Sequence, residues 1–293
     1  MRFAAIDVGS NAVRLLISEV YDGQLYVEFK KVLFVRVPLR LGVAVFSENK
    51  LSKSKTTDLI KVIAAFKNLI DVSQVDEMMA CATAAMREAQ NGKEVLKKIK
   101  AETGVKIELI EGTKEAEIIY SNHIAEQLND TSPYLYIDVG GGSTELTLFS
   151  NGKIIDSNSF PIGTIKMLYD KISEKQWNEV KTWIKGLKDY KNIIAIGTGG
   201  NINKIFKLIG KKENKSISID EIREKTEFLE SLSLKDRIEK LGLNEDRADV
   251  IVPAGKIFIN IMKWGAIENV HVPRIGLADG IIHHLYEKSL VKA

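Results

Sequence analysis

The sequence has a single cysteine, little net charge and no long apolar run, and each of these shortages excludes or disfavours one kind of protein. Cys81 has no second cysteine to pair with, so an intramolecular disulfide is excluded. It stands in an apolar run, where a buried small side chain is expected rather than a reactive thiol. No apolar stretch approaches the roughly 18 residues of a membrane-spanning helix. A soluble, cytoplasmic protein without a membrane partner is therefore expected.

The charge balance gives no support for a dedicated nucleic-acid-binding protein. Lys and Arg total 42 against 39 Asp and Glu, a net charge of +3, whereas nucleic-acid-binding domains normally carry a strong basic excess. A local basic run is present at Lys204, Lys207, Lys211, Lys212 and Lys215. This run is either a solvated helix face or a guide for a polyanionic substrate.

The order of hydrophobic patterns predicts an α/β protein. The length of 293 residues favours two domains, at roughly 150 residues per domain. Strand patterns with tight turns open the chain, a helical apolar period follows, and strands and helices then alternate. In this first part we expect strands at 3–6, 13–20, 25–35, 75–82 and 105–110, and helices at 53–70, from about 83, and at 114–128.

The opening pattern then occurs a second time, which indicates an internal duplication. Ile137-Asp138-Val139-Gly140-Gly141 corresponds to Ile6-Asp7-Val8-Gly9-Ser10, and each follows or ends a strand. A cluster of breaker residues at 129–133 lies between the two halves. We therefore expect domains at 1–128 and 129–293, with the last helix able to pack back on the first domain. The expected elements of the second half are strands at 134–137, 144–150, 153–160 and 193–196, and a helix at 250–264.

Glycine-rich turns after predicted strands are the first candidates for a binding site. Glycine lets backbone N–H groups approach a ligand closely, which suits phosphate oxygens. Side-chain donors accompany the turns at Ser10, Asn11, Ser143, Thr144 and Thr198. A single such turn is explained equally well by the need of tight turns for glycine. Neither turn of the duplicated pair has a mononucleotide or dinucleotide motif opening a helix, so a hairpin would hold the phosphate.

Acidic residues next to these turns suggest a divalent cation. Asp7 and Asp138 precede the two duplicated turns, and Glu145 follows the second one. Magnesium takes one or two carboxylates together with waters and substrate phosphates. The alternative is that the two aspartates only cap their turns. Because the acid occurs in both halves, we favour the ligand role.

Ordered sequence blocks along nearly the whole chain resemble the exopolyphosphatase / guanosine pentaphosphate phosphohydrolase family. The two glycine turns with their flanking strands carry the resemblance, at 7–15 and 136–146. It continues through Arg40-Leu41-Gly42 and the blocks at 82–89, 111–116, 197–200 and 247–255.

The resemblance implies the fold of actin, sugar kinases and chaperone ATPases. That fold has two ribonuclease-H-like α/β domains, with the active site in the cleft between them. The chain is similar to the short, two-domain form of the family, without the helical C-terminal region of long members. From this we expect a preference for short polyphosphates. A homodimer is left open.

The resemblance also implies the roles of individual residues. Glu115 falls on the catalytic carboxylate that activates the attacking water, and Arg87 falls on an arginine that contacts phosphate. Asp138 and Glu145, with Asp7, are the expected ligands of Mg²⁺, for which Mn²⁺ is a substitute. The expected phosphate-binding residues are Gly9, Ser10, Asn11, Arg14, Gly140, Gly141, Gly142, Ser143, Thr144, Gly199 and Gly200.

Two departures from the family pattern bear on the substrate. Lys114 stands where a second acid usually precedes the alanine, and Ala278 stands where an arginine is usual. The expected function is release of terminal orthophosphate from inorganic polyphosphate. The alternatives are hydrolysis of guanosine pentaphosphate, a non-catalytic sensor of polyphosphate or an alarmone, and a kinase or ATPase of the wider superfamily.

Overall fold

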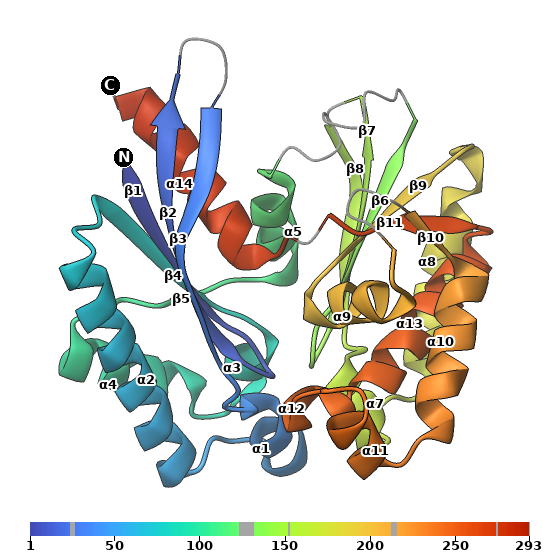
Figure 1. Cartoon of the computed structure of the whole chain (residues 1–293), viewed down its shortest axis with the longest axis horizontal. Coiled ribbons are helices and arrows are strands. Elements are labelled where there is room, and N and C mark those ends of the chain that lie inside the picture. The colour runs from blue at the N-terminus through green and yellow to red at the C-terminus, as the bar shows by residue number, and fades with distance from the viewer. Residues whose placement is uncertain (24–26, 123–131, 152, 212–215, 274, 293) are drawn as a thin grey trace. The chain divides into compact units, whose positions relative to one another are not determined.

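A computed structural model describes residues 1–23, 27–122, 132–151, 153–211, 216–273 and 275–292 of the chain. The chain divides into two compact units (Figure 1). The first unit comprises Met1–Asn122 and Ile275–Ala293, and the second unit comprises His123–Arg274. The predicted boundary between 128 and 129 lies outside the described residues. The last helix, α14 (Leu277–Lys292), groups with the first unit.

The first unit is built on a sheet with the strand order β3-β2-β1-β4-β5. Its central strand is almost fully buried, as its near-continuous apolar sequence predicts. β1 pairs antiparallel with β2 and parallel with β4, so the expected three-stranded meander is confirmed and extended by parallel strands. The strands are β1 (Arg2–Val8), β2 (Val13–Asp22), β3 (Val27–Val37), β4 (Glu77–Ala82) and β5 (Glu108–Leu109).

Helices cover both faces of this sheet. Figure 1 shows α2 and α4 on one face, where they contact each other, and α5 and α14 on the other. Phe29 of β3 stacks on His283 of α14, with ring centroids 3.7 Å apart, and Lys31 forms an ion pair with Asp279 at 2.5 Å. The helices are α1 (Leu41–Glu48), α2 (Lys53–Val72), α3 (Ala84–Glu88), α4 (Gly92–Thr103) and α5 (Gly112–Tyr120).

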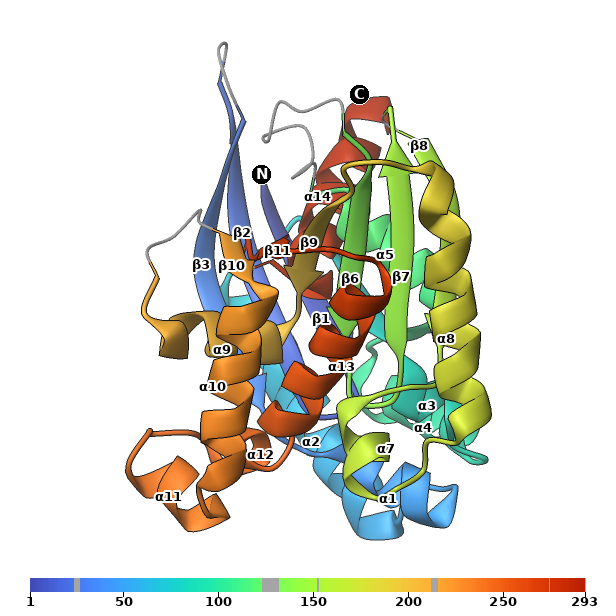
Figure 2. The same ribbon diagram turned by 90° about the vertical axis from the view of Figure 1, so that its right-hand side faces the viewer.

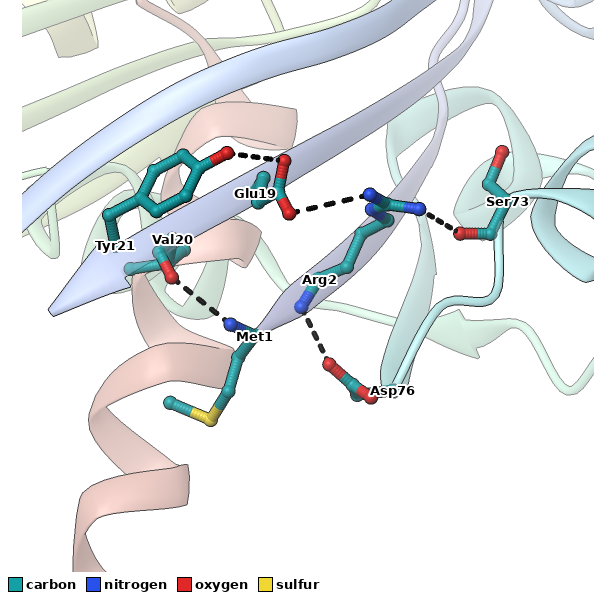
Figure 3. A network of polar contacts seen from close by, with 7 residues as sticks. All are labelled: Met1, Arg2, Glu19, Val20, Tyr21, Ser73 and Asp76. Atoms are coloured by element: carbon teal, nitrogen blue, oxygen red, sulfur yellow. Dashed lines mark hydrogen bonds and ion pairs between the residues drawn. The ribbon is translucent and has the colours of Figure 1, made fainter.

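Polar contacts fix the start of β1, at the end of the sheet away from the glycine turn (Figure 3). The Arg2 guanidinium donates to the carbonyl of Ser73 at 2.6 Å, and the Arg2 amide donates to Asp76 Oδ2 at 2.7 Å. The same guanidinium lies 3.4 Å from Glu19 on β2, and Tyr21 donates to that carboxylate at 2.8 Å. The hydrogen bond from Tyr21 holds the pKa of Glu19 below its ordinary value. These contacts tie β1 to β2 and to the connection between α2 and β4.

The second unit repeats the sheet of the first, which confirms the duplication. Its strand order is β10-β11-β9-β6-β7-β8, and β6 pairs antiparallel with β7 and parallel with β9, as β1 does with β2 and β4. The predicted α/β fold of two related units is therefore confirmed. The strands are β6 (Tyr134–Val139), β7 (Thr144–Ser150), β8 (Lys153–Phe160), β9 (Ile194–Thr198), β10 (Ser216–Ser218) and β11 (Asn269–His271).

A long apolar helix forms the centre of the second unit's core. α13 (Ile251–Trp264), close to the predicted range, packs on β6 and contacts α7, α8, α9 and α10 (Figure 2). The other helices are α7 (Thr164–Leu168), α8 (Glu174–Gly186), α9 (Gly200–Ile209), α10 (Ile219–Ser231), α11 (Leu234–Glu239) and α12 (Glu245–Ala248), with a 3₁₀ turn η1 (Leu187–Asp189) after α8. No helix in the described part of the chain is long and apolar enough to cross a membrane.

The outer strands of the two sheets share an irregularity. In the first unit, the β2–β3 register shifts between Ile17 and Ser18, so that Val32 of β3 is an extra residue. In the second unit, the β7–β8 register shifts between Leu148 and Phe149, and Ile155 of β8 is the extra residue. Counted from Asp7 and from Asp138, the two shifts fall at the same position. The duplicated halves therefore share their β-bulge as well as their strand order.

Several elements differ from the expected ones. The strand expected at 105–110 is reduced to Glu108–Leu109, and the helix expected from about 83 is divided into α3 and α4. The helix expected at 114–128 begins earlier, at Gly112, and is described as far as Tyr120. Its expected last part lies mostly outside the described residues. The short helices α1, α7, α11 and α12 were not predicted.

Candidate functional site

The glycine turns lie at the carboxyl ends of parallel strands, which is where α/β sheets usually bind ligands. In the first unit, Asp7 and Val8 end β1, and the Thr83 amide that follows β4 donates to the Val8 carbonyl at 3.2 Å. In the second unit, Asp138 and Val139 end β6 beside Thr198, the last residue of β9. Each unit therefore has one such edge.

The first turn is held by backbone hydrogen bonds and an ion pair. The Gly9 amide donates to the Ala12 carbonyl at 3.2 Å. The carbonyls of Ser10 and Asn11 accept from the amides of Gly42 and Arg40, at 2.8 and 2.9 Å, which fixes the start of α1.

Asp7 of this turn already has a basic partner. The strand register places Asp7 opposite Arg14, and the Arg14 guanidinium lies 2.5 Å from Asp7 Oδ2. The side chain of Asp7 is 7% exposed and that of Arg14 is 26% exposed. This pair supports the alternative in which Asp7 is a structural acid of its turn.

Glu115 and Arg87 lie close to the same edge of the first unit. Glu115 is buried in the first turn of α5, where the helix dipole favours a negative charge. Burial first, and then the negative charges of Glu108, Asp7 and Glu115, raise the pKa of the Cys81 thiol to about 12. The Ile110 amide donates to the carbonyl of Ala82 at 3.1 Å, and Ala82 is the β4 partner of Val8, so α5, which begins at Gly112, starts close to the end of β1.

Arg87 connects α3 to the start of α5. Its guanidinium donates to the Ile110 carbonyl at 2.7 Å, and its Nε lies 3.7 Å from Glu111 Oε2. Glu111 is the residue that precedes α5, one turn before Glu115. Arg87 therefore positions the segment that carries Glu115, in addition to any contact with phosphate.

The second turn is closed on its carbonyl side by α7. The Gly140 amide donates to the Ser143 carbonyl at 2.9 Å, which forms the hairpin. The amides of Thr164 and Ile165 donate to the carbonyls of Gly140 and Gly141 at 3.0 and 2.9 Å. The first turn of α7 thus fixes the shape of the loop.

Two carboxylates lie side by side across the strands that flank this turn. The register places Asp138 of β6 directly opposite Glu145 of β7. Glu145 is 4% exposed, and its Oε1 accepts hydrogen bonds from the hydroxyls of Ser143 at 2.6 Å and Ser159 at 2.9 Å. By duplication, Glu145 stands where the first unit has Arg14, so the two halves carry opposite charges at this position.

The third turn approaches Asp138 closely. Gly199 has a φ of +94°, and a Cβ at this residue would lie 2.7 Å from Asp138 Oδ1. Only glycine allows this backbone conformation and this approach together. Two glycine turns that are far apart in the sequence therefore meet at one carboxylate.

The third turn also opens a helix, an arrangement that sequence analysis did not foresee. α9 begins at Gly200, directly after Gly199, with no side-chain cap. The positive end of a helix dipole at this point favours a negatively charged ligand. The hydroxyl of Thr198 is buried, and its Oγ1 makes no hydrogen bond within the described residues. A buried polar atom of this kind is usually explained by a ligand or a water.

Two basic residues that were not predicted for the site lie beside the start of α9. Arg247 donates to the Gly200 carbonyl at 2.6 Å. Burial lowers the pKa of Lys204, and the nearby cations Lys207 and Arg247 lower it further. Arg247 belongs to one of the motif blocks and Lys204 belongs to the basic run, so the sequence contained an indication for both residues. Lys212 and Lys215 of that run lie outside the described residues.

The donor set fits a magnesium ion only in combination with a substrate. Within the described ranges, no group of three or more His, Cys, Asp or Glu side chains converges as a complete metal site. Asp138 and Glu145 supply two carboxylates on neighbouring strands. That number suits Mg²⁺, which completes its octahedron with waters and substrate phosphates.

Comparison with known sequences identifies the family. The sequence model of the Ppx/GppA phosphatase family matches residues 16–289. The chain belongs to the Ppx/GppA phosphatase family. The resemblance carried by the motif blocks is therefore confirmed.

Relatives of this Ppx/GppA protein include named enzymes. Exopolyphosphatase 1 of Mycobacterium leprae is 25% identical over 96% of this chain and 88% of its own length. A bifunctional 3-dehydroquinate synthase/phosphatase of Fusobacterium nucleatum is 30% identical over 89% of this chain and 43% of its own length.

Solved structures support the same assignment. The crystal structure of the Aquifex aeolicus Ppx/GppA family member has a TM-score of 0.77 at 25% identity and covers 99% of this chain and 98% of that one. An exopolyphosphatase from Cytophaga hutchinsonii has a TM-score of 0.84 at 20% identity over 98% of both chains. At this level of identity, the similarity supports the fold and not the activity.

Proposed function

We propose that this Ppx/GppA protein hydrolyses the terminal phosphoanhydride bond of inorganic polyphosphate and releases orthophosphate. The observation that carries the proposal is the pair of carboxylates, Asp138 and Glu145, beside two glycine turns and the start of α9. Such a pair is suited to a divalent cation that also binds phosphate. The similarity to exopolyphosphatase 1 of Mycobacterium leprae supports the choice of substrate.

In the proposed reaction, the residues of the second unit bind and orient the phosphate. The backbone of the glycine turns, the Thr198 hydroxyl and the amino end of α9 are the groups that would face phosphate oxygens. When bound at Asp138 and Glu145, Mg²⁺ would supply neutralisation of the charge on the terminal phosphate. The hydrogen bonds from Ser143 and Ser159 hold the Glu145 carboxylate in a fixed orientation.

Glu115 is the proposed base. It would accept a proton from the water that attacks the terminal phosphorus, while the bond to the bridging oxygen breaks and the shortened polyphosphate leaves. Phosphoryl transfer needs little covalent chemistry from the protein, so positioning and charge neutralisation account for most of the acceleration. Arg87 would hold the start of α5, and with it Glu115.

The test compares two substitutions on α5. Glu115→Gln should reduce orthophosphate release from tripolyphosphate and longer polyphosphates by about two orders of magnitude, the usual scale for loss of a general base. Glu117→Gln is the matched control, since Glu117 is 50% exposed and forms an ion pair with Lys114 on the surface. It should leave turnover unchanged. Equal activity of the two variants, with both folded, would exclude Glu115 as the base.

A second candidate, hydrolysis of guanosine pentaphosphate, follows from the double name of the family. The same assay should therefore include guanosine pentaphosphate, with magnesium and in excess chelator. Faster release from the nucleotide than from any polyphosphate would favour this candidate. Binding of either substrate without turnover would indicate a sensor, and activity in excess chelator would exclude the metal role of Asp138 and Glu145.

A further inference from the structure

The second unit has a hollow at the edge of its sheet opposite the glycine turns. Its volume is about 830 Å³, and residues at the starts of β6, β9 and β11 line it, including Leu135, Ile194 and Asn269. Leu135 of β6 lines the hollow, and the turn after Asp138 begins five residues later, which separates the two by about 17 Å along the strand. We call this hollow the rear pocket. It shares no lining residue with the glycine turns and the carboxylates of the second unit.

The floor of the rear pocket is apolar, and two aromatic rings form part of its wall. Leu135, Ile184 and Ile267 are buried beneath it. Tyr190 and Trp264 are half-buried. Trp264 is held in place by an edge contact with Trp177, with ring centroids 5.9 Å apart. An apolar floor with aromatic walls suits a flat ring of a ligand.

The rim of the rear pocket carries a net positive charge. Lys185, Lys188 and Lys191 line it together with one acid, Glu268, and all four residues are exposed. Lys185 lies in the last turn of α8, where a cation is explained by the helix dipole alone. Lys188 and Lys191 lie beyond the end of α8, in η1 and in the segment that leads into β9. Their side chains form no ion pair within the described ranges, so no carboxylate there neutralises their charge.

The backbone of two loops around the pocket is unusual. Asn192 and Ala266 both have positive φ, at 57° and 50°, and both line the rear pocket. Alanine rarely adopts this conformation, whereas asparagine does so more often. Local strain held by the surrounding structure is typical of ligand sites.

We infer that the rear pocket is a nucleotide-binding site, with the base against Tyr190 and Trp264 and the phosphates toward Lys188 and Lys191. An inorganic polyphosphate would leave the apolar floor unused, and an uncharged ring would leave the lysines unused. A nucleoside triphosphate uses both. This site is independent of the proposed function, because none of its residues belongs to the catalytic site.

The test is a calorimetric titration of the whole chain with the non-hydrolysable triphosphate AMP-PNP. The variant Lys188→Glu/Lys191→Glu should bind it at least about tenfold more weakly than the wild type, since both charges face the phosphates. Lys97→Glu/Lys100→Glu is the matched control, because these exposed lysines of α4 have the same spacing and lie in the first unit. It should bind as the wild type does.

A third variant tests the aromatic wall. Tyr190→Leu keeps an apolar side chain and should weaken AMP-PNP binding severalfold, without changing the binding of inorganic tripolyphosphate. Absence of AMP-PNP binding to the wild type at millimolar concentration would overturn the inference. Binding that Lys188→Glu/Lys191→Glu leaves unchanged would overturn it as well, because the nucleotide would then lie elsewhere. Equal effects of Tyr190→Leu on both ligands would overturn the placement of the base.

Discussion

Replacing Gly199 by alanine would test whether the position of the Asp138 carboxylate matters for activity. A Cβ at this residue would lie 2.7 Å from Asp138 Oδ1, while ordinary van der Waals contact begins at 3.4 Å. Either the carboxylate or the turn must therefore move by about 0.7 Å. Magnesium accepts little distortion of its octahedron, and a misplacement of about 1 Å at a reacting centre can cost about 100-fold in rate.

The expected loss of activity lies between about 10-fold and 100-fold, with a higher magnesium concentration needed for half-maximal rate. The backbone adds a cost in stability. Gly199 has φ of 94° and ψ of 165°, a region in which only glycine is common and in which other residues cost about 1–3 kcal/mol. For a unit of this size, that corresponds to a decrease in Tm of about 2–12 °C.

Gly210 at the other end of α9 supplies the control. It also has positive φ, at 84°, but a Cβ there would meet no atom of the described residues within 4 Å. Gly210→Ala should therefore lower Tm by a few degrees and leave the rate and the magnesium requirement unchanged. Both variants are compared at a temperature where each is folded, by orthophosphate release over a magnesium titration. If Gly199→Ala loses no more activity than Gly210→Ala, the argument about the Asp138 carboxylate is refuted.

Two further predictions concern the first unit. Arg14→Ala leaves the buried carboxylate of Asp7 without its ion-pair partner and should lower the free energy of unfolding by about 2–3 kcal/mol. This loss is smaller than the ~3–5 kcal/mol of a fully buried pair, because the Arg14 side chain is 26% exposed. Urea unfolding of the variant that matches the wild type would contradict this prediction. The pKa of about 12 for Cys81, raised from 9.0, means that the folded state favours the neutral thiol. The contribution of the neutral Cys81 thiol to folding stability is fully present below pH 9 and decreases as the pH rises toward 12. At pH 8 the thiol should therefore react about a thousandfold more slowly in the folded than in the unfolded protein, and rapid labelling of the folded protein by a thiol reagent would show that Cys81 is accessible.

The duplicated core could be predicted from sequence because its signals are local. The strand, the acid and the glycine turn follow one another within a few residues, and the pattern occurs twice. The long apolar period of α13 likewise identifies a buried helix. The short helix α7 has no such signal, because its start depends on the carbonyls of Gly140 and Gly141, which are more than twenty residues earlier in the chain.

The details of the candidate site depend on contacts between distant residues and could not be predicted in the same way. Nothing in the local sequence indicates that Gly199 lies against Asp138, or that Arg247 donates to the Gly200 carbonyl. The opposite charges at Arg14 and Glu145 become comparable only when the two registers are aligned. The rear pocket was missed for a similar reason, since its walls come from six separate elements, β6, α8, η1, β9, α13 and β11.

The shared bulges have a consequence for how the molecule behaves at high concentration. An exposed strand at the edge of a sheet offers unpaired backbone groups to a strand of another molecule, and bulges, lysines and very short edge strands all prevent this. β5 and β10 end their sheets with two and three residues, while the long edges β3 and β8 carry the extra residues Val32 and Ile155. Each bulge twists the ribbon and interrupts the row of donors and acceptors within the strand. All four edges are thus poor templates for strand addition, so the duplication preserved a protection against aggregation together with the fold.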